Sequence, residues 1–256
     1  MGLGIAAISY DAVPTLADFS ARRGITFPLL SDPGSGVIKS YGILNTTVPP
    51  TNQQQYGIPF PGSFFVDKAG VVTSRVFESA YQERTTMSTE MVRLGQSIGA
   101  PATKVQASYL ELTTYVTDQL VAPGTHFSVV LDMKPGSKVH VYAPGVTGYK
   151  PIALRIDAQP GLIPRNAQFP TPEDYFFAPL NEHVAVYSKP FRIMQDLIID
   201  PSPQAAKALE GVTSLTVKGV LDYQACNDKE CFLPQSIPLS WTVALKALDR
   251  ERVPRP

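Results

Sequence analysis

The pattern of expected elements changes once along the chain, and this change constrains the fold more than any other feature. Over residues 2–98, strand-like apolar runs alternate with helix-like segments in the order strand, helix, strand, helix, strand, strand, helix. That order is typical of an α/β domain. Residues 105–247 instead contain short alternating segments separated by Pro, Gly and Asn, as in an all-β sandwich. The sequence therefore predicts two domains, residues 1–100 and 104–248, followed by a tail over residues 249–256.

Charge and hydropathy exclude several classes of partner. Lys+Arg and Asp+Glu both number 22, so the formal net charge is zero, and we expect no nucleic-acid partner. The longest apolar runs, such as residues 2–9, are strand-sized and far shorter than the roughly 20 residues of a membrane-spanning helix. The three histidines, His126, His140 and His183, lack metal-ligand spacing, so we expect no metal site and no cofactor.

The chain has two cysteines, Cys226 and Cys231, which flank a polar four-residue connection. Across a hairpin, residues of a non-hydrogen-bonded pair approach to about 4.5 Å between Cα atoms, which a disulfide accepts. A bond that closes so small a loop stabilises the fold by only about 2 kcal/mol. The spacing alone leaves three interpretations open: a structural clip, two free thiols or a redox pair.

In the first half, the segment Pro-Gly-Ser-Phe-Phe-Val-Asp from Pro61, followed by Lys-Ala-Gly, resembles the part of thioredoxin-like redoxins that carries their cis-proline. These redoxins include the TlpA and AhpC/TSA peroxiredoxin groups. Residues 2–11 and 27–43 are similar to the elements that precede this segment in those families. The resemblance implies a thioredoxin-like domain in which Pro61, in preference to Pro59, is the cis-proline beside a redox thiol.

The catalytic part of these redoxins has no counterpart in the first half. They carry the active cysteine on a strand–helix unit upstream of the strand over residues 2–9, whereas residues 1–225 contain no cysteine. A thiolate is the nucleophile in both peroxide reduction and disulfide exchange. We therefore expect an incomplete domain, which favours a fragment of a longer protein over a degenerate scaffold. A peroxiredoxin-like peroxidase is an alternative only for a longer parent chain.

In the second half, YQACNDKECFLP (residues 223–234), followed by PLSW, resembles the active-site hairpin of the N-terminal domain of DsbD, a bacterial thiol–disulfide interchange protein. Residues 138–145, 154–157 and 183–193 match further segments in family order. The resemblance implies that the second domain is an immunoglobulin-like sandwich. The expected fold class is thus an incomplete α/β thioredoxin-like domain followed by this all-β sandwich.

The same resemblance implies roles for individual residues. Cys226 and Cys231 become the catalytic redox pair, and His140 and Tyr142 lie where the family has aromatic residues beside it. Tyr223 precedes Cys226 on its strand and is a third supporting residue. The family also shields its cysteines with an aromatic loop.

Residues 169–179, with Tyr175, Phe176 and Phe177, form the aromatic-rich loop of this chain and our candidate for that shield. Core packing is the alternative for these aromatic residues.

Together these features predict a thiol–disulfide oxidoreductase, or electron-relay protein, of the bacterial cell envelope. The implied partner is a thioredoxin-like or membrane-embedded exchange protein, with disulfides of exported proteins as substrates. Such pairs work where disulfides persist, so we expect a periplasmic or otherwise extracytoplasmic location, with the export signal absent from this chain. The alternative is a non-catalytic binding module with a structural disulfide on a degenerate redoxin scaffold.

Overall fold

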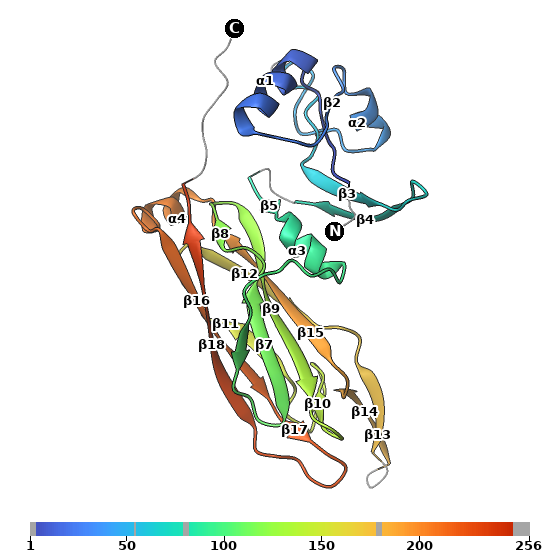
Figure 1. The fold of residues 1–256 in the computed structure, drawn as a ribbon, viewed down its shortest axis with the longest axis vertical. Coiled ribbons are helices and arrows are strands. Elements are labelled where there is room, and N and C mark those ends of the chain that lie inside the picture. The colour runs from blue at the N-terminus through green and yellow to red at the C-terminus, as the bar shows by residue number, and fades with distance from the viewer. Residues whose placement is uncertain (1–3, 54, 79–81, 178–180, 248–256) are drawn as a thin grey trace. The chain divides into compact units, whose positions relative to one another are not determined.

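The chain divides into a first unit that ends at residue 81 and a second unit over residues 82–248. The computed structural model describes residues 4–53, 55–78, 82–177 and 181–247 (Figure 1). The expected tail, residues 249–256, lies outside the described residues. No helix among the described residues is both long and apolar enough to cross a membrane.

The first unit has the mixed helix and strand content that the sequence predicts. The strands β1 and β2 pair in parallel and are connected by the helix α1, while β3 and β4 form an antiparallel hairpin. α1 has Pro14 in its first turn and ends at Gly24, whose φ of 61° is left-handed, a conformation that glycine adopts readily. The elements are β1 (Ala7–Ser9), α1 (Val13–Arg23), β2 (Leu29–Ser31), α2 (Gly36–Ser40), β3 (Gly62–Val66) and β4 (Val72–Phe77).

The strand expected over residues 2–9 is shorter and less buried than its apolar sequence suggests. β1 covers only Ala7–Ser9, and Ile8 is 37% exposed while Leu30 on its partner β2 is 50% exposed. Among the described residues β1 pairs with β2 alone. An apolar run becomes buried only where other elements cover both faces of its sheet, and the described residues do not supply that cover.

The second unit is mostly β, as predicted. Two sheets, in the strand orders β12-β15-β9-β7-β6 and β11-β16-β18-β8, share the main hydrophobic core. A third sheet, β13-β14-β10-β17, carries Cys226. The elements are β5 (Arg84–Thr85), α3 (Met87–Arg93), β6 (Thr103–Val105), β7 (Leu110–Val116), β8 (Leu120–Val121), β9 (Thr125–Pro135), β10 (His140–Tyr142), β11 (Ala153–Ile156), β12 (Leu162–Gln168), β13 (Glu173–Phe177), β14 (Glu182–Tyr187), β15 (Phe191–Ile199), α4 (Pro203–Ala208), β16 (Ser214–Tyr223), β17 (Ala225–Cys226) and β18 (Gln235–Leu245).

The main core is built from alternate residues of these strands. Phe127 and Leu197 from one sheet and Leu221 from the other are fully buried in it. The indole Nε1 of Trp241 on β18 donates a 2.8 Å hydrogen bond to Oγ1 of Thr114 on β7, so a buried polar contact also links the two sheets. Strands that are apolar on alternate residues predict such a core.

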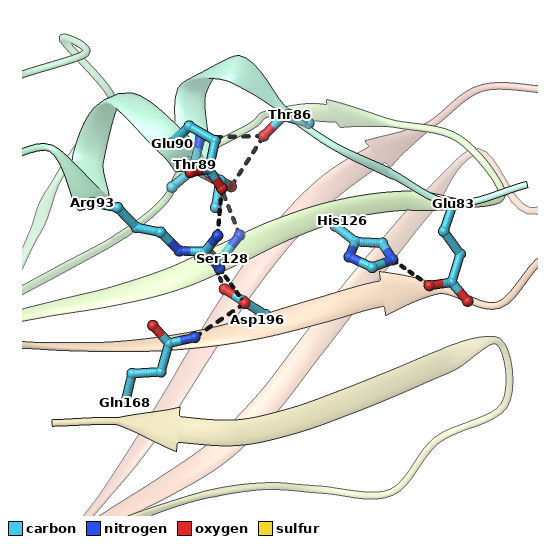
Figure 2. A network of polar contacts seen from close by, with 10 residues as sticks. Glu83, Thr86, Thr89, Glu90, Arg93, His126, Ser128, Gln168 and Asp196 are labelled. Atoms are coloured by element: carbon cyan, nitrogen blue, oxygen red, sulfur yellow. Dashed lines mark hydrogen bonds and ion pairs between the residues drawn. The ribbon is translucent and has the colours of Figure 1, made fainter. Parts of the chain in front are cut away.

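The helix α3 belongs to the second unit, although the sequence places its residues at the end of the first domain. Val92 is buried against Val130 of β9 and Met194 of β15. Figure 2 shows the polar side of the same attachment, where Arg93 pairs with Asp196 of β15. The division after residue 81 therefore differs from the boundary expected near residues 100–104. The helical periodicity identifies an apolar face, but it does not say which core that face covers.

Candidate functional site

Cys226 and Cys231 form a disulfide, with their Cα atoms 4.0 Å apart. They are opposite each other as an antiparallel bridge. The flanking backbone hydrogen bonds run from Asn227 N to Glu230 O and from Phe232 N to Ala225 O, both 2.9 Å long. The expected pairing across a hairpin is confirmed, and the free-thiol interpretation does not describe this structure.

A side chain holds the four-residue turn of this hairpin. The Oδ1 atom of Asn227 accepts hydrogen bonds from the backbone N–H groups of Lys229 and Glu230, at 2.8 and 2.9 Å. Asparagine commonly closes turns in this way, because its side chain mimics a backbone carbonyl. The two cysteines are thus placed opposite each other by contacts that do not involve sulfur.

The two cysteines differ in their access to solvent. Cys226 is 1% exposed and packs in a small apolar cluster with Tyr142, Val184 and Val186. Cys231 is exposed. The disulfide is therefore open to solvent on the side of Cys231 and covered on the side of Cys226.

The third sheet brings His140, Tyr142 and Cys226 to one face. Successive residues of a strand point to opposite faces, so Val141 of β10 and Ala225 of β17 enter the main core. His140 and Tyr142 lie on the other face of β10, and His140 is directly opposite Cys226 in the register of β10 and β17. The sequence alternation of β10 therefore accounts for the grouping of both supporting residues beside the disulfide.

Tyr142 places a hydroxyl group beside the exposed sulfur. Its Oη atom lies 3.6 Å from Sγ of Cys231, and its ring stacks on Tyr149 with the ring centroids 4.2 Å apart. The Tyr149 hydroxyl in turn donates to Glu182 of β14. Burial raises the pKa of Tyr142 to about 12, so its hydroxyl keeps its proton near neutral pH and is available as a donor to sulfur.

His140 is buried in the same site without a hydrogen bond at one of its ring nitrogens. It is 4% exposed, and among the described residues its Nε2 atom has no hydrogen-bond partner. Its ring lies edge-on to Tyr142 at 5.4 Å and tilted over Tyr175 at 4.6 Å. Burial lowers the pKa of His140, so the imidazole is neutral near pH 7.

The hairpin β13–β14 brings aromatic residues to the site. Residues 173–177 form a strand where the sequence suggested a loop over residues 169–179, while residues 178–180 lie outside the described residues. Tyr175 and Phe177 line the disulfide cavity, whereas Phe176 contacts His183 and is largely exposed. Aromatic residues favour a strand, and the prolines on either side concealed this preference in the sequence.

The cavity next to the disulfide has a volume of about 140 Å³. The Tyr175 hydroxyl donates a 2.9 Å hydrogen bond to Oδ1 of Asp228, which joins the hairpin β13–β14 to the cysteine turn. The site therefore combines a disulfide, a proton-bearing hydroxyl, a buried imidazole and an aromatic wall. The lining residues are His140, Tyr142, Tyr149, Tyr175, Phe177, Val184, Asn227, Lys229, Glu230 and Cys231.

Two expected site residues lie elsewhere. Tyr223 is fully buried in the main core, where its hydroxyl donates a 2.8 Å hydrogen bond to the carbonyl oxygen of Ser108. Pro61 belongs to the first unit, and the described residues contain no cis peptide bond, so the expected cis-proline is wrong for this structure. The trans form is the intrinsically favoured isomer, and the first unit has no cysteine for a cis-proline to pack against.

The sequence did not point to Tyr149 or Glu182, whereas Asp228 lies in the turn between the two cysteines. Tyr149 lies in a loop rich in Gly and Pro that has no periodicity, and Glu182 is a charged residue of ordinary surface type. The proximity of Tyr149 and Glu182 to the disulfide depends on the folding of β14 and the cysteine turn onto one site.

Comparison with known proteins supports the redoxin resemblance of the first unit. Residues 1–75 match the AhpC/TSA family. Over 68 residues the chain is 38% identical to alkyl hydroperoxide reductase E from Mycobacterium tuberculosis, which covers 26% of this chain and 39% of that protein. It is also 36% identical over 75 residues to a putative peroxiredoxin from the same organism, covering 28% of this chain and 44% of that one. The chain thus spans about two fifths of the length of the curated relatives that it matches.

Among solved structures, the chain is similar to the N-terminal periplasmic domain of ScsB from Proteus mirabilis. The TM-score is 0.36 and the sequence identity 14%, covering 53% of this chain and 49% of that one.

Proposed function

We propose that the protein is a thiol–disulfide oxidoreductase that relays electrons through Cys226 and Cys231. The observation that carries this proposal is the asymmetry of the pair, in which Cys231 is exposed and Cys226 is buried beneath aromatic residues. A bond with one accessible sulfur suits directed exchange with a protein partner. The similarity of residues 1–75 to the AhpC/TSA family supports a thiol redox context for the chain.

The exchange reaction begins at the exposed sulfur. A partner thiolate attacks Sγ of Cys231, a new S–S bond forms between the partner and Cys231, and Cys226 leaves with the electron pair. A second thiolate of the partner then attacks the partner's own sulfur in this mixed disulfide. The partner leaves oxidised, and the protein retains two electrons as a reduced cysteine pair. The reverse sequence delivers those electrons to a substrate disulfide.

The contribution of the bond to stability favours this role over that of a structural clip. The closed loop is very short, so the disulfide stabilises the fold by only about 2 kcal/mol in the chain-entropy estimate. The hairpin is also held by Asn227 and by the backbone bonds on either side of the cysteines. Opening the bond therefore leaves the local fold supported.

The partners and the location belong to the same proposal. A thioredoxin-like or membrane-embedded dithiol protein would supply electrons, and disulfides of exported proteins would accept them. An extracytoplasmic compartment fits a pair that must cycle through the oxidised form. In this proposal the second unit is an immunoglobulin-like module related to the N-terminal domain of DsbD.

The reduction potential of the pair tests the proposal directly. We expect a midpoint between about −180 and −280 mV in glutathione and dithiothreitol buffers, the range of redox-active dithiols. Free thiols would be counted by mass after alkylation. A midpoint below about −300 mV would contradict the proposal and identify a structural clip in a binding module.

Exchange with a reduced thioredoxin provides the functional measurement. Cys226→Ser and Cys231→Ser should each abolish turnover, whereas Ser240→Ala, at an exposed position of β18, should leave it unchanged. Turnover that persists in Cys226→Ser would show that the pair is not the carrier.

A further inference from the structure

The disulfide site contains one buried polar atom that the exchange steps above do not use. Nε2 of His140 is the atom concerned, and none of the described residues forms a hydrogen bond with it. Burying a polar group without a partner is unfavourable, so such an atom in a folded protein calls for an explanation. In this site the explanation lies in what the neighbouring sulfur becomes when the disulfide opens.

The register of the third sheet places His140 beside the buried cysteine. His140 and Cys226 are directly opposite each other on β10 and β17, and the Cβ atoms of such a pair lie about 5 Å apart on the same face. In the disulfide, Cys226 has no proton and no charge for the imidazole to bind. After the S–S bond breaks, the same sulfur carries a negative charge in an apolar cluster.

We propose that His140 is the acid–base partner of Cys226 and changes its protonation with the redox state of the pair. This inference rests on the proposed exchange function. When a partner thiol reacts, its proton ends on the neutral imidazole, its sulfur bonds to Cys231, and Cys226 receives the electron pair of the broken bond. The products are a mixed disulfide and a Cys226 thiolate paired with the His140 imidazolium. In the reverse direction, the imidazolium returns the proton to the leaving thiolate of the partner.

The charged groups around His140 are compatible with this change. The Asp228 carboxylate, in the cysteine turn, favours the imidazolium and opposes the effect of burial. Lys229 and Glu230 line the same cavity with opposite charges, and Glu182 accepts a hydrogen bond from Tyr149. The tyrosine hydroxyls on β10 and β13 are neutral near pH 7. The negative charge of a new thiolate at Cys226 therefore shifts the protonation equilibrium of His140 towards the imidazolium.

A titration of the histidine imidazoles by NMR in the full-length protein tests this proposal. Oxidised protein and protein reduced with dithiothreitol would be compared, with assignment from His140→Gln. We expect the titration midpoint of His140 to be higher in the reduced protein by about one pH unit or more. His183 lies on the opposite face of β14, beside Asp174, and its midpoint should not move. Equal midpoints for His140 in the two states would overturn the proposal.

A second measurement follows the pKa of the Cys226 thiol instead of that of the His140 imidazole. In Cys231→Ser, Cys226 is the one remaining thiol, and the ultraviolet absorbance of its thiolate can be followed against pH. Adding His140→Gln should raise the pKa of this thiol by about one unit, a roughly tenfold loss of thiolate near neutral pH. His183→Gln is the matched control and should leave the pKa unchanged. An unchanged pKa in the His140→Gln protein would contradict the inference.

These outcomes separate the inference from the proposed function. A pair that resists physiological reductants would defeat the electron-relay proposal, yet the titrations of chemically reduced protein would still report on His140. Conversely, an exchange-active pair with a redox-independent His140 would defeat the inference alone.

Discussion

At the scale of single residues, two buried tyrosines show how position decides function. Burial raises the pKa of both Tyr142 and Tyr223 to about 12. The Tyr142 hydroxyl faces the sulfur of Cys231, whereas the Tyr223 hydroxyl donates to the carbonyl oxygen of Ser108. One hydroxyl can stabilise a thiolate, and the other stabilises only the fold.

We expect Tyr142→Phe to raise the pKa of the Cys231 thiol by about one unit, because a donor to the thiolate is lost. The measurement is the pH dependence of alkylation in a Cys226→Ser background, where Cys231 is the single thiol. Tyr223→Phe is the control: it should lower the free energy of unfolding by about 1 kcal/mol without changing the thiol pKa. If the pKa of the Cys231 thiol does not change in the Tyr142→Phe protein, the hydroxyl has no part in the exchange site.

A site residue could be predicted from the sequence where its position depends on residues close to it in the chain. The geometry of Cys226 and Cys231 is set by one short turn, so their spacing predicted that they could bridge but left the free-thiol interpretation open until the structure showed the disulfide. Tyr223 lies three positions before Cys226, and an odd separation along extended chain tends to place two side chains on opposite faces. The family resemblance made Tyr223 a supporting residue against this alternation, and the structure places Tyr223 in the main core. The proximity of Tyr149 depends on long-range folding and has no local signal.

At the scale of elements, the attachment of α3 depends on polar as well as apolar contacts. Thr86 caps the helix by accepting a hydrogen bond from the N–H of Thr89, at 3.2 Å, and it donates to Oδ2 of Asp118 at 2.6 Å. On the sheet side, Ser128 donates to Oδ1 of Asp196 at 2.6 Å, and this carboxylate also pairs with Arg93 (Figure 2). The helix is thus fixed at its first and last turns.

Thr86→Ala should lower the free energy of unfolding of the second unit by about 1–2 kcal/mol, because it removes the helix cap. Chemical denaturation followed by circular dichroism is the measurement. Thr216→Ala, at an exposed position paired with Thr242 on the neighbouring strand, should change the same quantity by less than about 0.5 kcal/mol. Equal effects of the two substitutions would argue against a specific role for the cap.

The hydrophobic periodicity of the sequence identified helices and strands better than it identified the elements that pack against them. The period of α3 marks an apolar face, and the alternation in β10 marks two faces, but neither says what lies against them. For β10, both faces are buried, one in the main core and one at the disulfide. For β1, an equally apolar sequence remains partly exposed. Burial depends on neighbouring elements, which a local pattern does not contain.

At the scale of the whole molecule, the structural division after residue 81 leads to a test by truncation. A polypeptide of residues 82–247 should fold cooperatively, because it keeps α3 with its contacts on β9 and β15. A polypeptide of residues 101–247 loses the buried side chains of Met91 and Val92 and uncovers Val130. We expect it to be less stable by at least about 3 kcal/mol, since full burial of one such side chain contributes about 1.5–3 kcal/mol.

Urea denaturation of the two polypeptides compares their free energies of unfolding under identical conditions. Both should be measured with the disulfide intact, so that the loss of residues 82–100, which carry β5 and α3, is the one difference between them. Equal stabilities would place the boundary near residues 100–104, as the sequence alone suggested.

The side-chain-supported turn between the two cysteines has a consequence for the lifetime of covalent complexes. Asn227 and the bond from Gln224 Nε2 to the carbonyl oxygen of Phe232 hold the hairpin without help from sulfur, so Cys226 stays opposite Cys231 after their bond is broken. A neighbouring thiol held in this way acts at an effective molarity far above that of any thiol in solution. Cys226 can therefore return to Cys231 and expel a bound partner. A mixed disulfide with an unproductive partner is therefore resolved by Cys226 itself. Only a partner whose second thiol reacts faster than Cys226 completes the transfer of electrons.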